Sequence, residues 1–149
     1  MVGILIAGHG NFPTGVFSAI ALVAGSTDNV FACDFENGMS SEELKANMTE
    51  AINKAEGEGV LILCDLAGGT PNRTAVELKA EMTDKKIRVI SGANLPAIMD
   101  AAFSAGDSDD VDELAAQVFE SGIEGFVDFD RTEDDAAGAD EVDDFGDGI

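Results

Sequence analysis

The chain has few basic and few aromatic residues. Its 149 residues include 30 acidic side chains but only eight Lys or Arg, so the net charge is −22, and Trp and Tyr are both absent. Nucleic acid and anionic membrane surfaces would repel such a chain, because binding to either depends on clustered basic residues. A basic protein surface is the partner that this charge favours. A flavodoxin-like electron carrier is disfavoured, because it would stack its flavin on aromatic rings of the kind that are missing.

Long apolar runs and clustered cysteines are missing as well. The apolar stretch Val16–Ala24 is far shorter than the ~20 residues that cross a bilayer, and the first residues, MVGILIAG, lack the basic leader of a signal peptide. Cys33 and Cys64 show no CxxC spacing, which predicts two buried thiols in a reducing compartment. We therefore expect a cytoplasmic protein that does not insert into the membrane.

What is present suits one globular domain followed by an acidic tail. Hydrophobic residues make up 45% of the chain, and a chain of this length buries roughly 68–70% of its unfolded surface. Residues 131–149 contain eight acids and one arginine, a net charge of −7, which leaves −15 for residues 1–130. The last stretch is too polar to bury. We predict a domain over residues 1–130 and a flexible tail over residues 131–149.

Short apolar runs alternate with helical segments along the predicted domain. Four continuous apolar runs predict strands that are covered on both faces of a parallel sheet: Val2–Ala7, Val30–Phe35, Val60–Cys64 and Ile87–Ser91. Capping residues and apolar spacing predict five helices: Thr14–Ala24, one that follows Ser40, one with Thr70 as N-cap and Pro71 at its first position, Asn94–Ala105 and Val111–Glu120. This alternation predicts an α/β fold, a doubly wound parallel sheet in the order 2-1-3-4 with helices on both faces. A last apolar run, Gly125–Phe129, is a candidate fifth strand.

His9 and Asp65 follow two strands that the predicted order makes neighbours. His9, the single histidine, lies in AGHGNFPTG after the first strand, and Asp65 opens DLAGGTPN after the third. Ligands of doubly wound sheets bind outside the carboxyl ends of the strands, so we predict that both side chains face one crevice. Gly68 and Gly69 allow close backbone approach, and the helix start that follows offers free N–H groups to an anion.

A histidine beside a carboxylate predicts phosphoryl transfer through the ring. One nitrogen of a neutral imidazole can take a phosphoryl group when the other is held protonated. We assign His9 as phosphoryl acceptor and donor, and Asp65 as the group that orients the ring and stabilises its positive charge. Four residues are candidates for binding the phosphoryl oxygens: Thr70, Gly69, Gly10 and Arg73. No cofactor or metal is expected, because one histidine among glycines offers too few ligands.

Each of these residues also has a simpler structural interpretation. His9 can be a turn or core histidine, Asp65 a helix cap or turn aspartate, and Gly68 and Gly69 no more than a tight turn. A serine or cysteine hydrolase is disfavoured, because no nucleophile motif or second base accompanies His9. The functional interpretation depends on these features meeting at one crevice.

Three motifs carry a resemblance to a known family. GILIAGHGNFPTG, CDLAGGTPN and SGANLPAIMD occur in order over a region of about residues 1–129 that resembles enzyme IIA of the mannose family of the bacterial phosphoenolpyruvate-dependent sugar phosphotransferase system. The resemblance implies that His9 accepts a phosphoryl group from phospho-HPr and passes it to a histidine of a separate IIB component, which serves the membrane subunits IIC and IID. Asp65 and Thr70 match the aspartate and the Ser/Thr of the family. A homodimer is also implied, in which Gly125–Phe129 can cross to the partner as an antiparallel edge strand.

The chain departs from the family pattern after Pro71. Asn72 and Arg73 stand where family members usually have an aromatic or small residue and then Asn. The alternative function is that of the histidine-phosphorylated subunit of a dihydroxyacetone-type kinase system, but the GGTP and ANLP motifs favour the transport branch. The sugar stays undetermined, because the resemblance implies that the membrane subunits select it.

Overall fold

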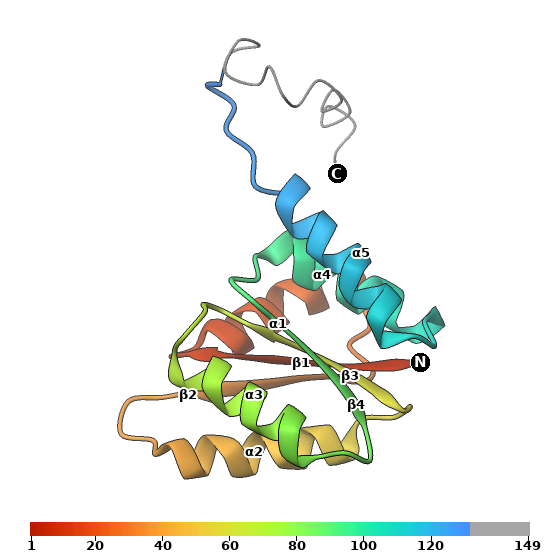
Figure 1. Cartoon of the computed structure of the whole chain (residues 1–149). Helices are drawn as coiled ribbons and strands as arrows, with labels where there is room; N and C mark the ends of the chain where they lie inside the picture. Colours follow the sequence, from red (N-terminus) through yellow and green to blue (C-terminus); the bar gives the residue numbers. More distant parts are fainter. Residues whose placement is uncertain (132–149) are drawn as a thin grey trace.

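The computed structural model describes residues 1–131, which form one parallel sheet between two layers of helices (Figure 1). In chain order the elements are β1 Val2–His9, α1 Phe12–Ala24, β2 Val30–Phe35, α2 Ser41–Lys54, β3 Gly59–Cys64, α3 Thr70–Glu81, β4 Lys86–Ser91, α4 Leu95–Ser104, a short 3₁₀ turn and α5 Val111–Glu124. The predicted acidic tail lies, beyond Arg131, outside the described residues.

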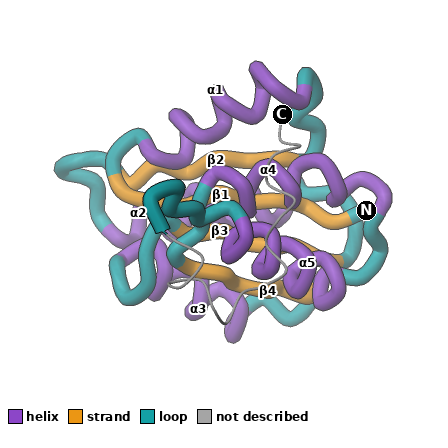
Figure 2. The backbone as a smooth tube through the Cα atoms, turned by 90° about the horizontal axis from the view of Figure 1, so that it is seen from above, coloured by secondary structure: helices purple, strands orange, loops and turns teal. Residues whose placement is uncertain are grey.

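The sheet has the strand order β2-β1-β3-β4, and each neighbouring pair is parallel (Figure 2). The predicted doubly wound α/β fold and its strand order are therefore confirmed. Because all four strands run the same way, the residues that follow them meet at one side of the sheet, which we call the carboxyl end. The opposite side is called the amino end.

The central strand β1 is buried on both faces, as its unbroken apolar run predicts. Ile4 and Ile6 pack in the cluster that the helices α1, α4 and α5 close. Leu5 and Ala7 pack in the second cluster, which α2 and α3 close on the other face. Two helical layers thus hold β1 rigidly and fix the position at which its last residue, His9, leaves the sheet.

Two helix boundaries differ from the predictions by two residues or more. Helix α1 begins at Phe12 and not at Thr14, because the N–H of Gly15 already closes a helical turn on the carbonyl of Asn11 at 2.8 Å. Helix α5 continues to Glu124, beyond the predicted end at Glu120. Gly122 remains helical there because it packs closely on α4, where an added Cβ would lie 3.1 Å from the Cβ of Ala97.

Both cysteines are buried free thiols, as predicted. Burial raises the pKa of Cys33 to about 11, with a further contribution from the nearby carboxylates of Asp34 and Glu50. Burial also raises the pKa of Cys64, to about 12. The two residues flank Ala7 on the strands to either side of β1, and both thiols are protonated at neutral pH.

Residues 125–131 leave the end of α5 without joining the sheet of the same chain. Gly125–Phe129 forms no strand within the described part of the chain, so its pairing with a second subunit stays a prediction. Phe126 and Phe129 are 88% and 91% exposed. Among residues 1–131, no helix combines the length and apolar character needed to span a membrane.

Candidate active site

His9 and Asp65 meet at the carboxyl end of the sheet, as the strand order predicts. His9 is the last residue of β1, and Asp65 directly follows β3, its neighbour. The imidazole is held at one nitrogen, since Nδ1 lies 2.9 Å from Oδ2 of Asp65. The histidine side chain is 44% exposed and the carboxylate 11%. The imidazole is therefore about half exposed, whereas the carboxylate that binds it is nearly buried.

The Asp65 carboxylate is held by three donors from the main chain and the ring. Oδ2 accepts hydrogen bonds from the His9 backbone N–H at 2.8 Å and from the ring, while Oδ1 accepts from the Leu66 N–H at 2.9 Å. Burial acts to raise the pKa of Asp65, but these hydrogen bonds outweigh it, so the pKa lies below its ordinary value. An ionised carboxylate requires a proton on Nδ1 of a neutral ring, and the lone pair of that tautomer is on Nε2.

Two glycines make room for this pair. At Gly69, an added Cβ would lie 2.7 Å from Cε1 and 3.2 Å from Nε2 of His9, so the loop after β3 passes directly against the free side of the ring. At Gly8, an added Cβ would lie 2.8 Å from Cγ of Asp65 and 3.0 Å from Cδ1 of Phe12. Larger residues at either position would displace the ring or the carboxylate.

Helix α3 begins beside the ring, but the predicted cap is wrong by one residue. Gly69 is the N-cap, because its carbonyl accepts the N–H of Arg73 at 3.0 Å, and Thr70 is the first helical residue. No side chain caps this helix, so the N–H groups of Thr70 and Asn72 have no capping partner among the described residues. An uncapped helix start beside an imidazole suits an anion with several oxygens.

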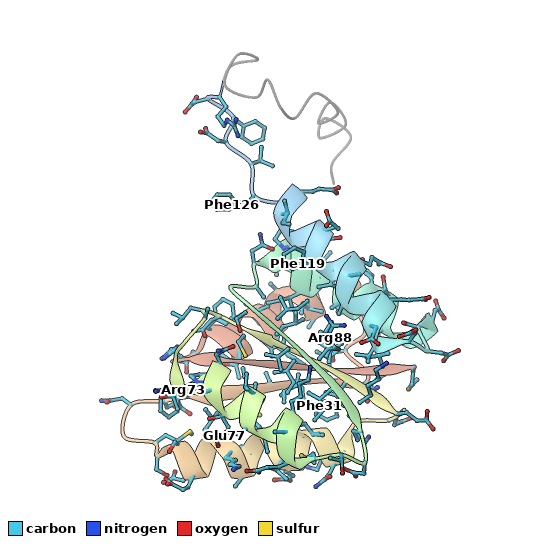
Figure 3. All side chains as sticks on the ribbon, viewed as in Figure 1. Phe31, Arg73, Glu77, Arg88, Phe119 and Phe126 are labelled. Carbon is cyan, nitrogen blue, oxygen red and sulfur yellow. The ribbon has the colours of Figure 1, made fainter. Side chains whose placement is uncertain are left out.

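Thr70 and Arg73 both line a cleft of about 400 Å³ between α2 and α3. Figure 3 shows Arg73 near the start of α3, with Glu77 one turn further along the helix. Glu77 is bound by Lys45 of α2, whereas Arg73 has no ion-pair partner within residues 1–131. The structure thus brings Gly69 to His9 and places Thr70 and Arg73 at the neighbouring cleft. Binding of a phosphoryl group by either of these two residues stays a prediction.

The turn after His9 is fastened to β2. Gly10 has the left-handed backbone angle φ of +58°, and its N–H donates to the carbonyl of Phe35 at 2.8 Å. This hydrogen bond occupies the Gly10 amide, and binding of a phosphoryl group by Gly10 stays a prediction. The Phe35 ring meets the imidazole edge-on, with ring centres 6.0 Å apart.

Sequence reasoning missed a second carboxylate at this end of the sheet. Asp34 of β2 accepts the backbone N–H of Thr14 at 3.0 Å and the Thr14 hydroxyl at 2.7 Å. In the predicted strand order β2 is the other neighbour of β1, so the end of β2 also lies next to His9. The sequence could therefore have indicated Asp34 as a residue of this site. As for metals, no group of three or more His, Cys, Asp or Glu among residues 1–131 could hold an ion.

Comparisons with known proteins identify the family of the chain. The family model described as "PTS system fructose IIA component" matches residues 3–119. The fructose-specific EIIA component of Bacillus subtilis is 31% identical over 101 residues, 67% of this chain and 68% of the relative. The mannose-specific EIIAB component of Escherichia coli K12 is 30% identical over 126 residues, which cover 83% of this chain but span only 38% of that relative.

A solved structure extends the likeness to the fold. The crystal structure of the phosphotransferase system component EIIA from Streptococcus agalactiae superimposes with a TM-score of 0.81 at 40% identity. The match covers 87% of this chain and 98% of the solved chain. Together with the match over residues 3–119, these relatives show that the chain belongs to the fructose/mannose-type IIA components of the phosphotransferase system.

Proposed function

We propose that this chain is a phosphoryl carrier of a sugar phosphotransferase system. His9 takes a phosphoryl group from phospho-HPr and passes it to a histidine of a IIB component. The observation that carries this proposal is the 2.9 Å contact between Nδ1 of His9 and Asp65, which leaves Nε2 as the available nucleophile. Family membership supports the general role, and the ring geometry supports the residue.

Each transfer breaks one bond to phosphorus and forms another. The Nε2 lone pair attacks phosphorus while the bond between phosphorus and HPr breaks, and HPr keeps the electron pair of that bond. The His9 ring gains positive charge as the new bond forms, and the ionised Asp65 beside Nδ1 stabilises that charge. Transfer to IIB is the same step in reverse, with the IIB histidine as nucleophile.

The start of α3 is the proposed cradle for the phosphoryl oxygens. Gly69 lies against the Nε2 side of the ring, and the helix that follows has no side-chain cap. In phosphoryl transfer the protein acts mainly by positioning and by stabilising charge on these oxygens. We assign this role to the Thr70 hydroxyl and the first N–H groups of α3, with Arg73 as the nearest basic side chain.

The proposed partners are proteins that meet this chain in the cytoplasm. HPr and IIB each dock transiently over His9, and the phosphoryl group then reaches the sugar through the membrane subunits IIC and IID. The net charge of −22 supports fast encounter with partners that present basic surfaces. Residues 1–130 are the proposed IIA domain.

A homodimer is proposed through the segment Gly125–Phe129. The edge strand β4 offers unpaired backbone groups, and a groove of about 340 Å³ beside it is lined by apolar residues of β4, α4 and α5, among them Ile90 and Ile123. Phe119 and Phe126 flank the end of α5 next to this groove (Figure 3). An antiparallel strand from a partner would cover both the groove and the edge.

The dimer is tested by changing exposed apolar residues of the segment. We expect Phe126→Asp with Phe129→Asp to convert a dimer into a monomer in analytical ultracentrifugation. Leu22→Asp is the matched control, because Leu22 of α1 is also 86% exposed but lies away from the segment. A double variant that sediments like the unchanged chain would contradict this interface.

The carrier function is tested by intact mass after incubation with phosphoenolpyruvate, enzyme I and HPr. We expect one acid-labile phosphoryl adduct on the unchanged chain and none on His9→Ala. No adduct on the unchanged chain, under conditions in which HPr becomes phosphorylated, would reject the function. An adduct that persists in His9→Ala would reject the assigned residue.

A further inference from the structure

The first turn of α1 is capped by a side chain from another element. Asn11 occupies the N-cap position, but its side chain accepts no capping hydrogen bond. Thr14 is the third helical residue, whose N–H an N-cap side chain ordinarily binds. Here the carboxylate of Asp34 on β2 takes that N–H at 3.0 Å and the Thr14 hydroxyl at 2.7 Å. A strand therefore supplies the cap that the helix itself lacks.

This cap lies directly beside the reactive histidine. In the register of β1 and β2, Asp34 is opposite Gly8 and Phe35 is opposite His9. Phe35 accepts the N–H of Gly10 at 2.8 Å and sets its ring against the imidazole, while Asp34 fixes Thr14. Two consecutive residues of β2 thus fasten both ends of the short turn that carries the chain from His9 into α1.

The two carboxylates near His9 bind different segments of the chain. Asp65 binds the backbone N–H and the ring nitrogen of His9 itself. Asp34 binds the segment that follows, and no acidic residue of the first turn of α1 complements the positive end of that helix. Without Asp34, the hydrogen bond from Gly10 to Phe35 would be the remaining one between this turn and β2 among the described residues, and the N–H of Thr14 would lose its acceptor.

We infer that Asp34 is a positioning residue for phosphoryl transfer at His9, acting through its double hydrogen bond to Thr14. The inference rests on the proposed carrier function. Displacing a reacting group by about 1 Å can slow a reaction as much as 10²-fold. A loosened turn should therefore lower the rate of transfer within the docked complex and change the affinity for phospho-HPr less. The role is geometric, so an uncharged acceptor of the same shape should serve.

The experiment compares Asp34→Ala with Asp34→Asn in phosphoryl transfer from phospho-HPr. We expect kcat to fall about tenfold in Asp34→Ala with KM changed less than about twofold, and Asp34→Asn to stay within about threefold of the unchanged chain, because Asn caps helices about as well as Asp. Asp110→Ala is the matched control. Asp110 caps α5 at the amino end of the sheet by accepting the N–H groups of Asp112 and Glu113.

An effect on stability alone is distinguishable from an effect on position. If Asp110→Ala and Asp34→Ala slow transfer equally at equal melting temperature, or if Asp34→Ala transfers normally, the inference is overturned. Should Asp34→Ala fail to fold, Thr14→Val removes the hydroxyl donor alone, with Thr14→Ser as its control, and the same loss of kcat is expected in Thr14→Val only.

A second readout separates this inference from the carrier function. Nitrogen-15 NMR of the His9 ring measures the proton distribution between Nδ1 and Nε2 without any transfer. We expect Asp34→Ala to broaden the His9 and Gly10 signals and to speed amide exchange at Thr14, with Asp110→Ala leaving all three unchanged. Failure of the unchanged chain to accept phosphoryl groups would reject the carrier function, whereas unchanged NMR signals in Asp34→Ala would reject the positioning role.

Discussion

The amino and carboxyl ends of the sheet hold their carboxylates with different partners. At the amino end, Asp112 of α5 binds Lys86 and Arg88 of β4, with Nη1 of Arg88 at 2.8 Å, and the N-terminal ammonium of Met1 lies 3.0 Å from Asp109. These partners carry full positive charges. Asp112 and Asp109 are thus held by ion pairs that already compensate their charges, whereas Asp110 at the same end caps α5 through backbone N–H groups.

At the carboxyl end, no Lys or Arg within residues 1–131 pairs with the two carboxylates near His9. Asp65 is bound by backbone N–H groups and the ring, and Asp34 by a backbone N–H and a hydroxyl. Such donors fix the position of a carboxylate and leave its negative charge available. A carboxylate that is not paired with Lys or Arg stabilises a neighbouring imidazole that becomes positive more strongly than an ion-paired carboxylate does. The difference between the two ends therefore shows which carboxylates can stabilise such a charge.

The largest expected effect comes from removing the responsive carboxylate. Asp65→Ala should lower the rate of transfer from phospho-HPr by about 10²-fold or more, because the ring loses both its orienting partner and its counter-charge. Asp112→Ala removes an ion-paired carboxylate of the other end and should leave the rate within about twofold. Rapid-quench kinetics measure both rates, and circular dichroism checks that both variants are folded. Equal rates in the two variants would remove Asp65 from the mechanism.

A smaller loss is expected from crowding the free side of the ring. In Gly69→Ala the new Cβ would stand 2.7 Å from Cε1 of His9, and the ring cannot yield without breaking its bond to Asp65. We expect transfer to slow about tenfold, an effect of position rather than of backbone strain, because the φ of Gly69 is −79°. Gly106→Ala, at a position where an added Cβ meets nothing within 4 Å, is the control. A normal rate in Gly69→Ala would show that the loop moves aside during transfer.

The contrast between the two ends also marks what the sequence could predict. The alternation of apolar runs and helices predicted a doubly wound fold, and the strand order common in such folds brought His9 to Asp65 although 56 positions separate them. The prediction of the helix caps was less accurate. The sequence predicts Thr70 as the N-cap of α3, but the N-cap is Gly69, one residue earlier.

The cap of α1 could not be read from its own segment at all. Thr14 looks like the beginning of a helix, whereas the helix begins at Phe12 and Thr14 donates to Asp34, 20 positions away. A contact of this kind depends on the register of β1 against β2, which apolar patterning does not specify to the residue. Gly125–Phe129 is a different case, because the proposed strand needs a second copy of the chain.

The pH dependence of stability should be alike at the two ends of the sheet, and its salt dependence should separate them. The pKa of Asp65 is lowered in the folded chain, so its contribution to stability is present above its unfolded pKa and is lost as the pH falls through the folded value, below about pH 4. The difference in melting temperature between the unchanged chain and Asp65→Asn should shrink over that range. Hydrogen bonds from Lys86 and Arg88 lower the pKa of Asp112 in the same direction.

Salt distinguishes the two carboxylates, because the donors to Asp65 are not permanently charged. Raising the ionic strength to about 0.5 M should reduce the effect of Asp112→Asn on melting temperature and leave that of Asp65→Asn nearly the same. Thermal unfolding between pH 3 and 7, at low and high salt, measures both. If salt weakens the two effects equally, the proposed difference between the ends of the sheet is wrong.

The smallest effect is expected from removing residues 132–149. They contain eight acids and no Lys or Arg, so truncation after Arg131 changes the net charge from −22 to −14. The Streptococcus agalactiae structure is matched over 98% of its length by 87% of this chain, which indicates that the fold needs little beyond the shared part. Melting temperature and the rate of transfer at physiological salt should both stay nearly unchanged. A clear loss of rate with an unchanged melting temperature would instead give this acidic stretch a part in docking, because it carries more than a third of the net charge.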